Sequence, residues 1–180
     1  MNPNALPPTF TSVYRLFLRA SSASVLHHKT ATRHLRLLWR PTFREAAKVI
    51  RKLQDDHINI SERQRCEKWM SRWEQNIDNT LELLYNSSRS RGLPHQLTKN
   101  LSFLCFGYQK WQHDQLYGST RKWDPSPEKH QKGSAPKPGQ NIERGQFKAE
   151  AWGALEEVAR MAEGTAGITL GRMKFVKRRS

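Results

Sequence analysis

Cysteine and long apolar runs are scarce in this sequence. Only Cys66 and Cys105 carry a thiol among its 180 residues. Two thiols cannot build a disulfide framework or a four-thiolate zinc site, so we expect a reducing compartment and place both thiols in the core. No stretch approaches the roughly 18 to 20 apolar residues of a membrane-spanning helix, and the N-terminal segment lacks the pattern of a secretory signal. The sequence therefore predicts a soluble or peripheral protein with no membrane span.

Acidic residues are also few. The chain has 31 lysines and arginines against 16 aspartates and glutamates, which gives a formal net charge of +15. A field of this sign attracts phosphate backbones, anionic membranes and acidic proteins, but it is uninformative about the fold. Hydrophobic residues make up 36% of the chain, less than the roughly 45 to 50% of an ordinary globular domain. We therefore expect part of the chain to lie outside any core, and we expect acidic partners.

No acidic residue precedes Glu45. The segment before it carries basic residues spread among serines and threonines, which is the composition of a mitochondrial targeting segment. These basic residues are Arg15, Arg19, Lys29, Arg33, Arg36, Arg40 and Arg44. The bias indicates the mitochondrial matrix. Because the same stretch has helical periodicity, the targeting information lies either on a removed peptide or inside the folded protein.

Signals of catalysis and of metal or nucleotide binding are missing. The seven histidines show no His-Glu-x-x-His spacing, and no paired thiolates accompany them. The stretch 164–171 lacks the Gly-Lys-Ser/Thr ending of a phosphate-binding loop. The acidic pairs at 55–56 and 156–157 are interpreted as solvated charges or helix-end partners. A nucleophile and a base that meet only in space would escape this search. On these residues we predict no enzyme, no metal site and no cofactor of the protein's own.

Apolar residues recur at helical spacing along most of the chain. Ser61 and Gln64 have the spacing of a capping box, and Pro94 suits the first turn of a helix. Pro41 predicts a kink, or a division into two segments, within the second helix. The expected helices span residues 10–18, 30–53, 61–84, 94–111 and 149–162. The predicted fold class is all-α: an antiparallel helical bundle with an extended basic arm and a short C-terminal helix. The predicted division is an N-terminal extension at 1–9, the bundle at 10–117, a linker or arm rich in proline, glycine and lysine at 118–145, and the C-terminal helix with a basic tail at 146–180.

The stretch from Val13 to Ala20, VYRLFLRA, resembles the opening helix of the LYR family of small mitochondrial proteins (complex I LYR-like), named for a Leu-Tyr-Arg tripeptide. At a distance similar to that in the family, the stretch 33–40, RHLRLLWR, brings arginines and then an aromatic residue. The element WRPTFREAA at 39–47 and the turn GLPH at 92–95 are similar to those of a fungal branch of the family. The resemblance covers residues 10–115 or so and implies an antiparallel helical bundle of the LYR type.

Members of the LYR family bind acylated mitochondrial acyl carrier protein, whose phosphopantetheine-linked acyl chain enters the helical core. The resemblance therefore implies that this carrier supplies the acyl-phosphopantetheine. It implies contacts with acyl carrier protein by Tyr14, Arg15, Arg19, Arg36 and Arg40. It implies an acyl-chain tunnel lined by Val13, Phe17, Leu18, Trp39 and Phe43. Taken without the resemblance, the aromatic residues are more typical of an ordinary core and the arginines of a solvated face.

The positive charge exceeds what one carrier protein would neutralise, so we expect a second acidic surface. Basic residues in the arm and tail are suited to ribosomal RNA, where released counterions add affinity. They are Arg121, Lys122, Lys129, Lys132, Lys137, Arg172, Lys174, Lys177, Arg178 and Arg179. The tail has the alternative interpretation of a frayed basic end. The leading prediction is a non-catalytic adaptor of the mitochondrial ribosome, as a subunit or an assembly factor. An assembly factor or accessory subunit of an inner-membrane respiratory complex is the alternative, and an iron-sulfur role comes third.

Overall fold

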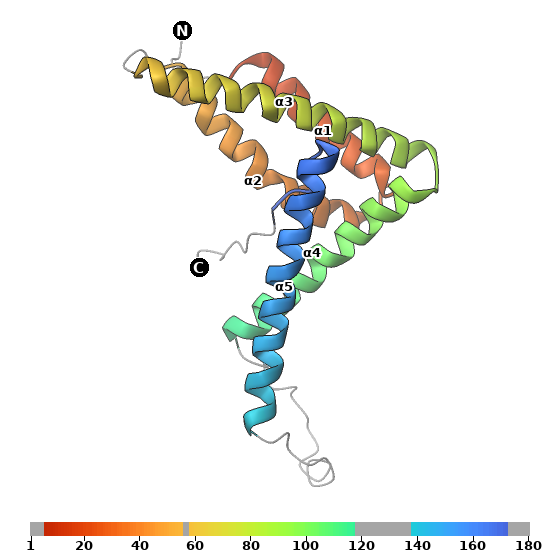
Figure 1. Cartoon of the computed structure of the whole chain (residues 1–180). Coiled ribbons are helices and arrows are strands. Elements are labelled where there is room, and N and C mark those ends of the chain that lie inside the picture. The colour runs from red at the N-terminus through yellow and green to blue at the C-terminus, as the bar shows by residue number, and fades with distance from the viewer. Residues whose placement is uncertain (1–5, 56–57, 118–137, 173–180) are drawn as a thin grey trace.

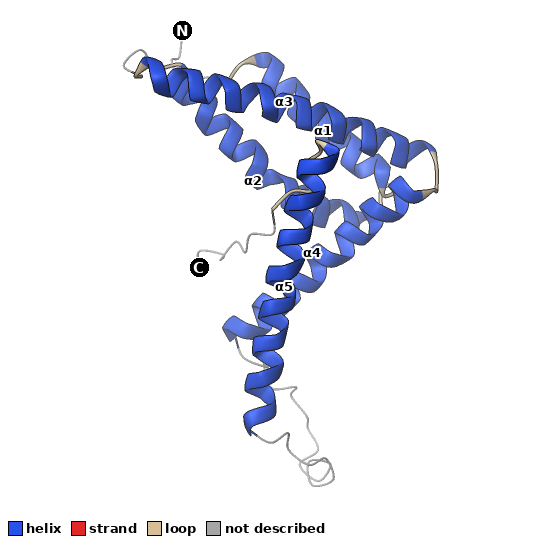
Figure 2. Ribbon diagram, viewed as in Figure 1, coloured by secondary structure: helices blue, strands red, loops and turns tan. Residues whose placement is uncertain are grey.

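The computed structural model describes residues 6–55, 58–117 and 138–172. All secondary structure in these residues is helical, as Figure 2 shows. The helices are α1 (Pro8–Ser24), α2 (Lys29–Leu53), α3 (Ile60–Arg89), α4 (Leu93–Tyr117) and α5 (Pro138–Ala166). The predicted all-α class is therefore confirmed for this part of the chain. None of the helices described here combines the length and the apolar character needed to cross a bilayer.

Helices α1 to α4 form a bundle around an aromatic core (Figure 1). Both α1 and α4 pack against α2 and α3. At the centre, the ring of Phe43 lies 5.0 Å from that of Phe17 and 5.3 Å from that of Trp73. The ring of Trp39 meets Phe17 edge-on at 5.1 Å. Such edge-to-face pairs add a modest attraction to the burial of large apolar surface, which is the main stabilising term here.

Helix α2 runs unbroken through Pro41. Of the two outcomes expected at this proline, a kink or a division into two segments, the division was wrong. A proline inside a helix removes one backbone hydrogen bond and crowds the preceding turn. Buried side chains on both sides of the proline, among them Leu38, Trp39 and Ala46, keep α2 against the core. Tertiary packing of its apolar face therefore keeps α2 continuous, although the local preference of proline would interrupt the helix.

Helix α3 starts slightly earlier than its sequence signal suggests. Its N-cap is Asn59, whose side-chain oxygen accepts a hydrogen bond of 3.3 Å from the backbone N–H of Ser61. Asparagine is among the best residues for this position. The capping box expected at Ser61 and Gln64 is thus replaced by a cap two residues upstream.

Helix α5 is longer than predicted at both ends. It begins at Pro138, inside the stretch expected to be a linker, and proline is favoured in a first helical turn. Figure 1 shows its first half extending past the bundle beside the end of α4. The contact with α4 is aromatic, because the ring of Trp152 lies 5.3 Å from that of Tyr108 and 6.4 Å from that of Trp111. The rest of the expected arm, residues 118–137, lies outside the described residues.

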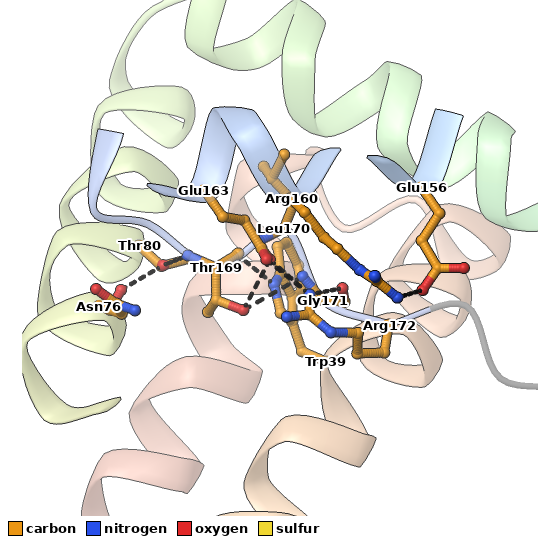
Figure 3. Close-up of polar contacts among 10 residues, drawn as sticks. All are labelled: Trp39, Asn76, Thr80, Glu156, Arg160, Glu163, Thr169, Leu170, Gly171 and Arg172. Atoms are coloured by element: carbon orange, nitrogen blue, oxygen red, sulfur yellow. Dashed lines mark hydrogen bonds and ion pairs between the residues drawn. The ribbon is translucent and has the colours of Figure 1, made fainter. Parts of the chain in front are cut away.

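Residues 167–172, which follow α5, form what we call the C-terminal strap. Figure 3 shows it passing beside α2 and α3. The carbonyl of Thr169 accepts a 2.9 Å hydrogen bond from Trp39 Nε1, and its N–H donates to Thr80 Oγ1 at 2.9 Å. The N–H of Arg172 donates to the carbonyl of Leu38 at 2.8 Å. Hydrogen bonds to two helices thus attach the strap to the bundle.

The two cysteines differ in burial. Cys105 lies in the core on α4 and is 3% exposed, as expected. Cys66 is only partly buried on α3, so placing both thiols in the core was wrong for this residue. Burial raises the pKa of Cys105 to about 11. Since the thiolate is the nucleophile, Cys105 should be inert at neutral pH.

We expect N-ethylmaleimide at pH 8 to modify Cys66 and to spare Cys105 in the folded protein. With a pKa near 11, about one Cys105 side chain in a thousand is ionised at pH 8. Peptide mass spectrometry before and after urea unfolding measures both sites. A Cys66→Ser protein should take up no label until it is unfolded. Early labelling of Cys105 in that variant would contradict the packing of α4.

Candidate functional site

A shallow cavity of about 720 Å³ lies between α1 and α2, and we call it the α1–α2 basic depression. Its lining contains four permanently charged side chains, one tyrosine and no acidic residue. The lining residues are Tyr14, Leu18, Ser22, His27, Lys29, Thr32, Arg33, Arg36, Leu37 and Arg40. A concave surface that carries only positive charge attracts anionic groups and raises their local concentration.

Helical spacing explains how the two walls form. On α1, Tyr14 and Leu18 are four residues apart and therefore share a face. On α2, the basic positions 29, 33, 36 and 40 repeat at intervals of four, three and four, which again is one face. The guanidinium of Arg36 reaches across and donates to the carbonyl of Leu18 at 3.3 Å. The ring of Tyr14 rests 4.9 Å from Phe43, which anchors it on the core.

The structure brings together three of the five residues expected to contact acyl carrier protein. Tyr14, Arg36 and Arg40 line the depression. Arg15 and Arg19 are exposed on α1 but do not line it. Lys29 and Arg33 line it as well, and sequence reasoning had not assigned them to this site. Lys29 and Arg33 are spaced from Arg36 and Arg40 as residues on one helical face are, and this spacing could have assigned them to the site from the sequence.

The five residues expected to form an acyl-chain tunnel do not line one cavity here. Phe17 and Trp39 are each 1% exposed, and Phe43 is 4% exposed. Val13 lies at a separate cavity of about 300 Å³ that also touches Trp73. Leu18 alone lines the basic depression. An acyl chain would reach the aromatic residues only if their rings moved apart.

All but one of the basic residues expected to contact RNA lie outside the described residues. Arg172 is the one whose side chain is described, and it is engaged within the protein. Its Nη1 donates to both carboxylate oxygens of Glu163 at 2.8 Å. Glu163 also accepts from the N–H of Leu170 at 2.7 Å, and its side chain is only 11% exposed. The side chain of Arg172 thus joins the C-terminal strap to the end of α5.

Within the described part of the chain, no group of three or more His, Cys, Asp or Glu side chains is placed to hold a metal ion. The indole N–H of Trp39, near the centre of the bundle, donates its hydrogen bond to the C-terminal strap. The cationic side chains of the α1–α2 basic depression can bind anionic groups.

No family model, curated protein or solved structure matches this chain. The resemblance to the LYR family therefore stays a prediction from the sequence.

Proposed function

We propose that this protein is a non-catalytic adaptor of the LYR type in the mitochondrial matrix, and that it binds acylated acyl carrier protein through the α1–α2 basic depression. The observation that carries the proposal is the depression itself, where four cationic side chains surround Tyr14 with no acidic residue among them. The site lies on the two helices that carry the resemblance to the family.

The charge of the depression suits the surface of a carrier protein. Acyl carrier proteins are acidic around the serine that bears phosphopantetheine, and the group itself contains a phosphate. Arg36 and Arg40 would donate charge-assisted hydrogen bonds to these oxygens. Arg15 and Arg19, exposed on the neighbouring face of α1, would extend the contact and speed the encounter through long-range attraction.

The acyl chain would have no open path from the depression into the core. The apolar residues Leu18 and Leu37 lie in the depression, and the Phe17–Trp39–Phe43 rings lie behind it. Burial of a chain contributes about 0.8 kcal/mol per methylene. That gain would have to exceed the cost of separating packed rings, so a long chain suits the site better than a short one. We therefore expect affinity to rise with acyl length.

The second acidic partner in the proposal is the mitochondrial ribosome, which the protein would serve as a subunit or an assembly factor. The support is the formal charge of +15, more than one carrier protein neutralises, together with the basic residues of the arm and tail. A respiratory complex of the inner membrane remains the alternative, and one experiment separates the two.

We expect the tagged full-length protein to co-purify acyl carrier protein from mitochondria, and the double variant Arg36→Glu/Arg40→Glu to lose it. Two reversed charges within the depression should weaken carrier binding by about a hundredfold or more. The matched control is Arg63→Glu/Arg72→Glu, which makes the same change of charge at exposed positions of α3 outside the depression. Mass spectrometry identifies the proteins, sequencing identifies bound RNA, and circular dichroism checks the folding of each variant.

Ribosomal proteins and ribosomal RNA in the eluate would favour the mitochondrial ribosome. Respiratory-complex subunits without RNA would select the alternative. Equal retention of the carrier by both double variants would remove the depression as its site, and no carrier in any preparation would overturn the LYR assignment.

A further inference from the structure

A second cavity, of about 710 Å³, opens between the α1–α2 turn, the first turns of α2 and the side of α4. We call it the α1–α4 pocket. It is separate from the α1–α2 basic depression, although Arg33 lines both. Its volume falls within the roughly 300 to 1,000 Å³ of small-molecule sites. Apart from Arg33, none of its lining residues that carry charge belongs to the proposed carrier-binding site.

One wall of the α1–α4 pocket consists of large apolar side chains that the fold leaves uncovered. Leu26, Phe103 and Phe106 all line it, and they are 49%, 60% and 53% exposed. Phe103 and Phe106 lie one turn apart on α4, while Leu26 faces them from the α1–α2 turn. The ring of His34 lies 5.4 Å from that of Phe106. Exposed apolar side chains gathered at a concave site are typical of ligand binding rather than of chance exposure.

The rim of the same pocket is cationic. Arg33, Arg91 and Lys99 converge on it from α2, the α3–α4 turn and α4, and none of the lining residues is acidic. These three side chains take part in none of the ion pairs formed among the described residues. Burial and the neighbouring Arg33 lower the pKa of His34, which favours the uncharged form of this ring at neutral pH.

The backbone at the rim is held in an uncommon conformation. Leu26 and His27 have φ values of 54° and 59°. They close α1 in a Schellman motif, with hydrogen bonds from Leu26 N–H to the carbonyl of Ala23 and from His27 N–H to that of Ser22. Glycine usually occupies the position of Leu26 in this motif, because a side chain there is strained. Here the chain keeps a leucine whose side chain lines the pocket.

Buried hydroxyl groups hold the walls of the pocket together. The carbonyl of Ser24 accepts a 3.1 Å hydrogen bond from Ser87 Oγ on α3 and lies 2.9 Å from His95 Nδ1 on α4. Ser87 Oγ also lies 2.8 Å from Thr98 Oγ1. The end of α1 is thus fixed to α3 and α4, so the pocket is preformed and a ligand need not order it.

We propose that the α1–α4 pocket binds a soluble amphiphile with a phosphate head and an unbranched apolar chain. Three cations from three elements suit a dianionic phosphate, which accepts several charge-assisted hydrogen bonds. The uncovered leucine and phenylalanines suit an apolar chain. A free phosphate would leave the apolar wall exposed, and an uncharged lipid would leave the cations unused.

The test is isothermal titration calorimetry of the full chain with decyl phosphate below its micelle-forming concentration. Inorganic phosphate and decyltrimethylammonium serve as the head-only and opposite-charge probes. We expect decyl phosphate to bind at least about tenfold more tightly than either. We expect Arg91→Glu/Lys99→Glu and Phe103→Ser/Phe106→Ser each to weaken it by about tenfold or more.

Leu26→Gly separates binding from folding. Because glycine relieves the strain at a positive φ, this variant should melt at the same temperature as the parent or higher, while it binds decyl phosphate more weakly. It also keeps the test decisive if the double phenylalanine variant does not fold. Arg63→Glu/Arg72→Glu is the charge-matched control and should bind as the parent does.

Equal binding of decyl phosphate and decyltrimethylammonium would overturn the proposal, as would binding that none of the three pocket variants changes. Sedimentation with phosphatidic acid vesicles, without binding of decyl phosphate, would replace it with a membrane-surface role. Binding of inorganic phosphate as tightly as decyl phosphate would overturn the proposed role of the apolar chain.

Discussion

A Gly171→Ala protein is expected to unfold at a temperature roughly 5 to 15 °C below that of the parent. Gly171 has a φ of +86°, and an added Cβ would lie 2.7 Å from both Cγ and the carbonyl oxygen of Leu38. Backbone oxygen cannot move aside cheaply, so the C-terminal strap would have to leave α2. The hydrogen bonds of the strap to Trp39, Thr80 and Leu38 would weaken with it.

Gly164→Ala is the matched control for this prediction. Gly164 lies within α5, and its added Cβ would meet no atom within 4 Å other than the neighbouring backbone of α5. Alanine there should leave stability unchanged or raise it by about 0.5 to 1 kcal/mol, since alanine is the better helix former. Thermal unfolding followed by circular dichroism measures both proteins. If the two melted together, the close approach of the strap to Leu38 would be wrong.

Trp39→Ala is expected to lower the free energy of unfolding by about 3 to 5 kcal/mol, the range for removing a large buried aromatic side chain. Trp39 is 1% exposed and packs on Phe17, so its loss leaves a cavity at the centre of the bundle. The carbonyl of Thr169 would also lose the N–H that it accepts at 2.9 Å. Equilibrium urea unfolding measures the change.

Two further variants divide this effect into its parts. Trp39→Phe keeps a ring in the core but removes the hydrogen bond to the strap, so we expect a smaller cost of about 1 to 3 kcal/mol. Trp69→Ala makes the same truncation on α3, where the side chain is 40% exposed, and should cost about 1 kcal/mol or less. If the Trp39→Ala and Trp69→Ala proteins were equally stable, Trp39 would not be a core residue.

The helices of the bundle could be predicted because α1 to α4 each carry a periodic apolar signal. The apolar spacing along α3 and the stop near Gly92 required no partner to be recognised. The errors came where a distant contact outweighed a local preference. Pro41 suggested a break, but burial of both flanks of α2 kept one helix. The stretch after Pro138 was expected to be a linker because its sequence has hardly an aliphatic residue. The contact of Trp152 with α4 is a tertiary feature.

The basic depression was half predictable. The arginines of α2 were visible as a charged helical face, and the resemblance to the LYR family directed attention to Tyr14. The pairing of that face with Leu18 and Ser22 of α1 depends on how the two helices are rotated against each other. Local sequence does not specify this rotation, which is why Arg15 was included. Lys29 was missed although its spacing from Arg33, Arg36 and Arg40 already placed it on the same face of α2.

Several properties were determined by the amino-acid sequence alone: an all-helical fold, a strongly positive charge, and arginines spaced along one face of α2. They follow from residue type and spacing, which act locally. The tertiary structure alone decided that Phe17 and Trp39 are closed into the core, that residues 167–172 lie against α2 and α3, and that Leu26, Phe103 and Phe106 meet beside three cations. These features join residues far apart in the chain, and such contacts form only when the helices pack together.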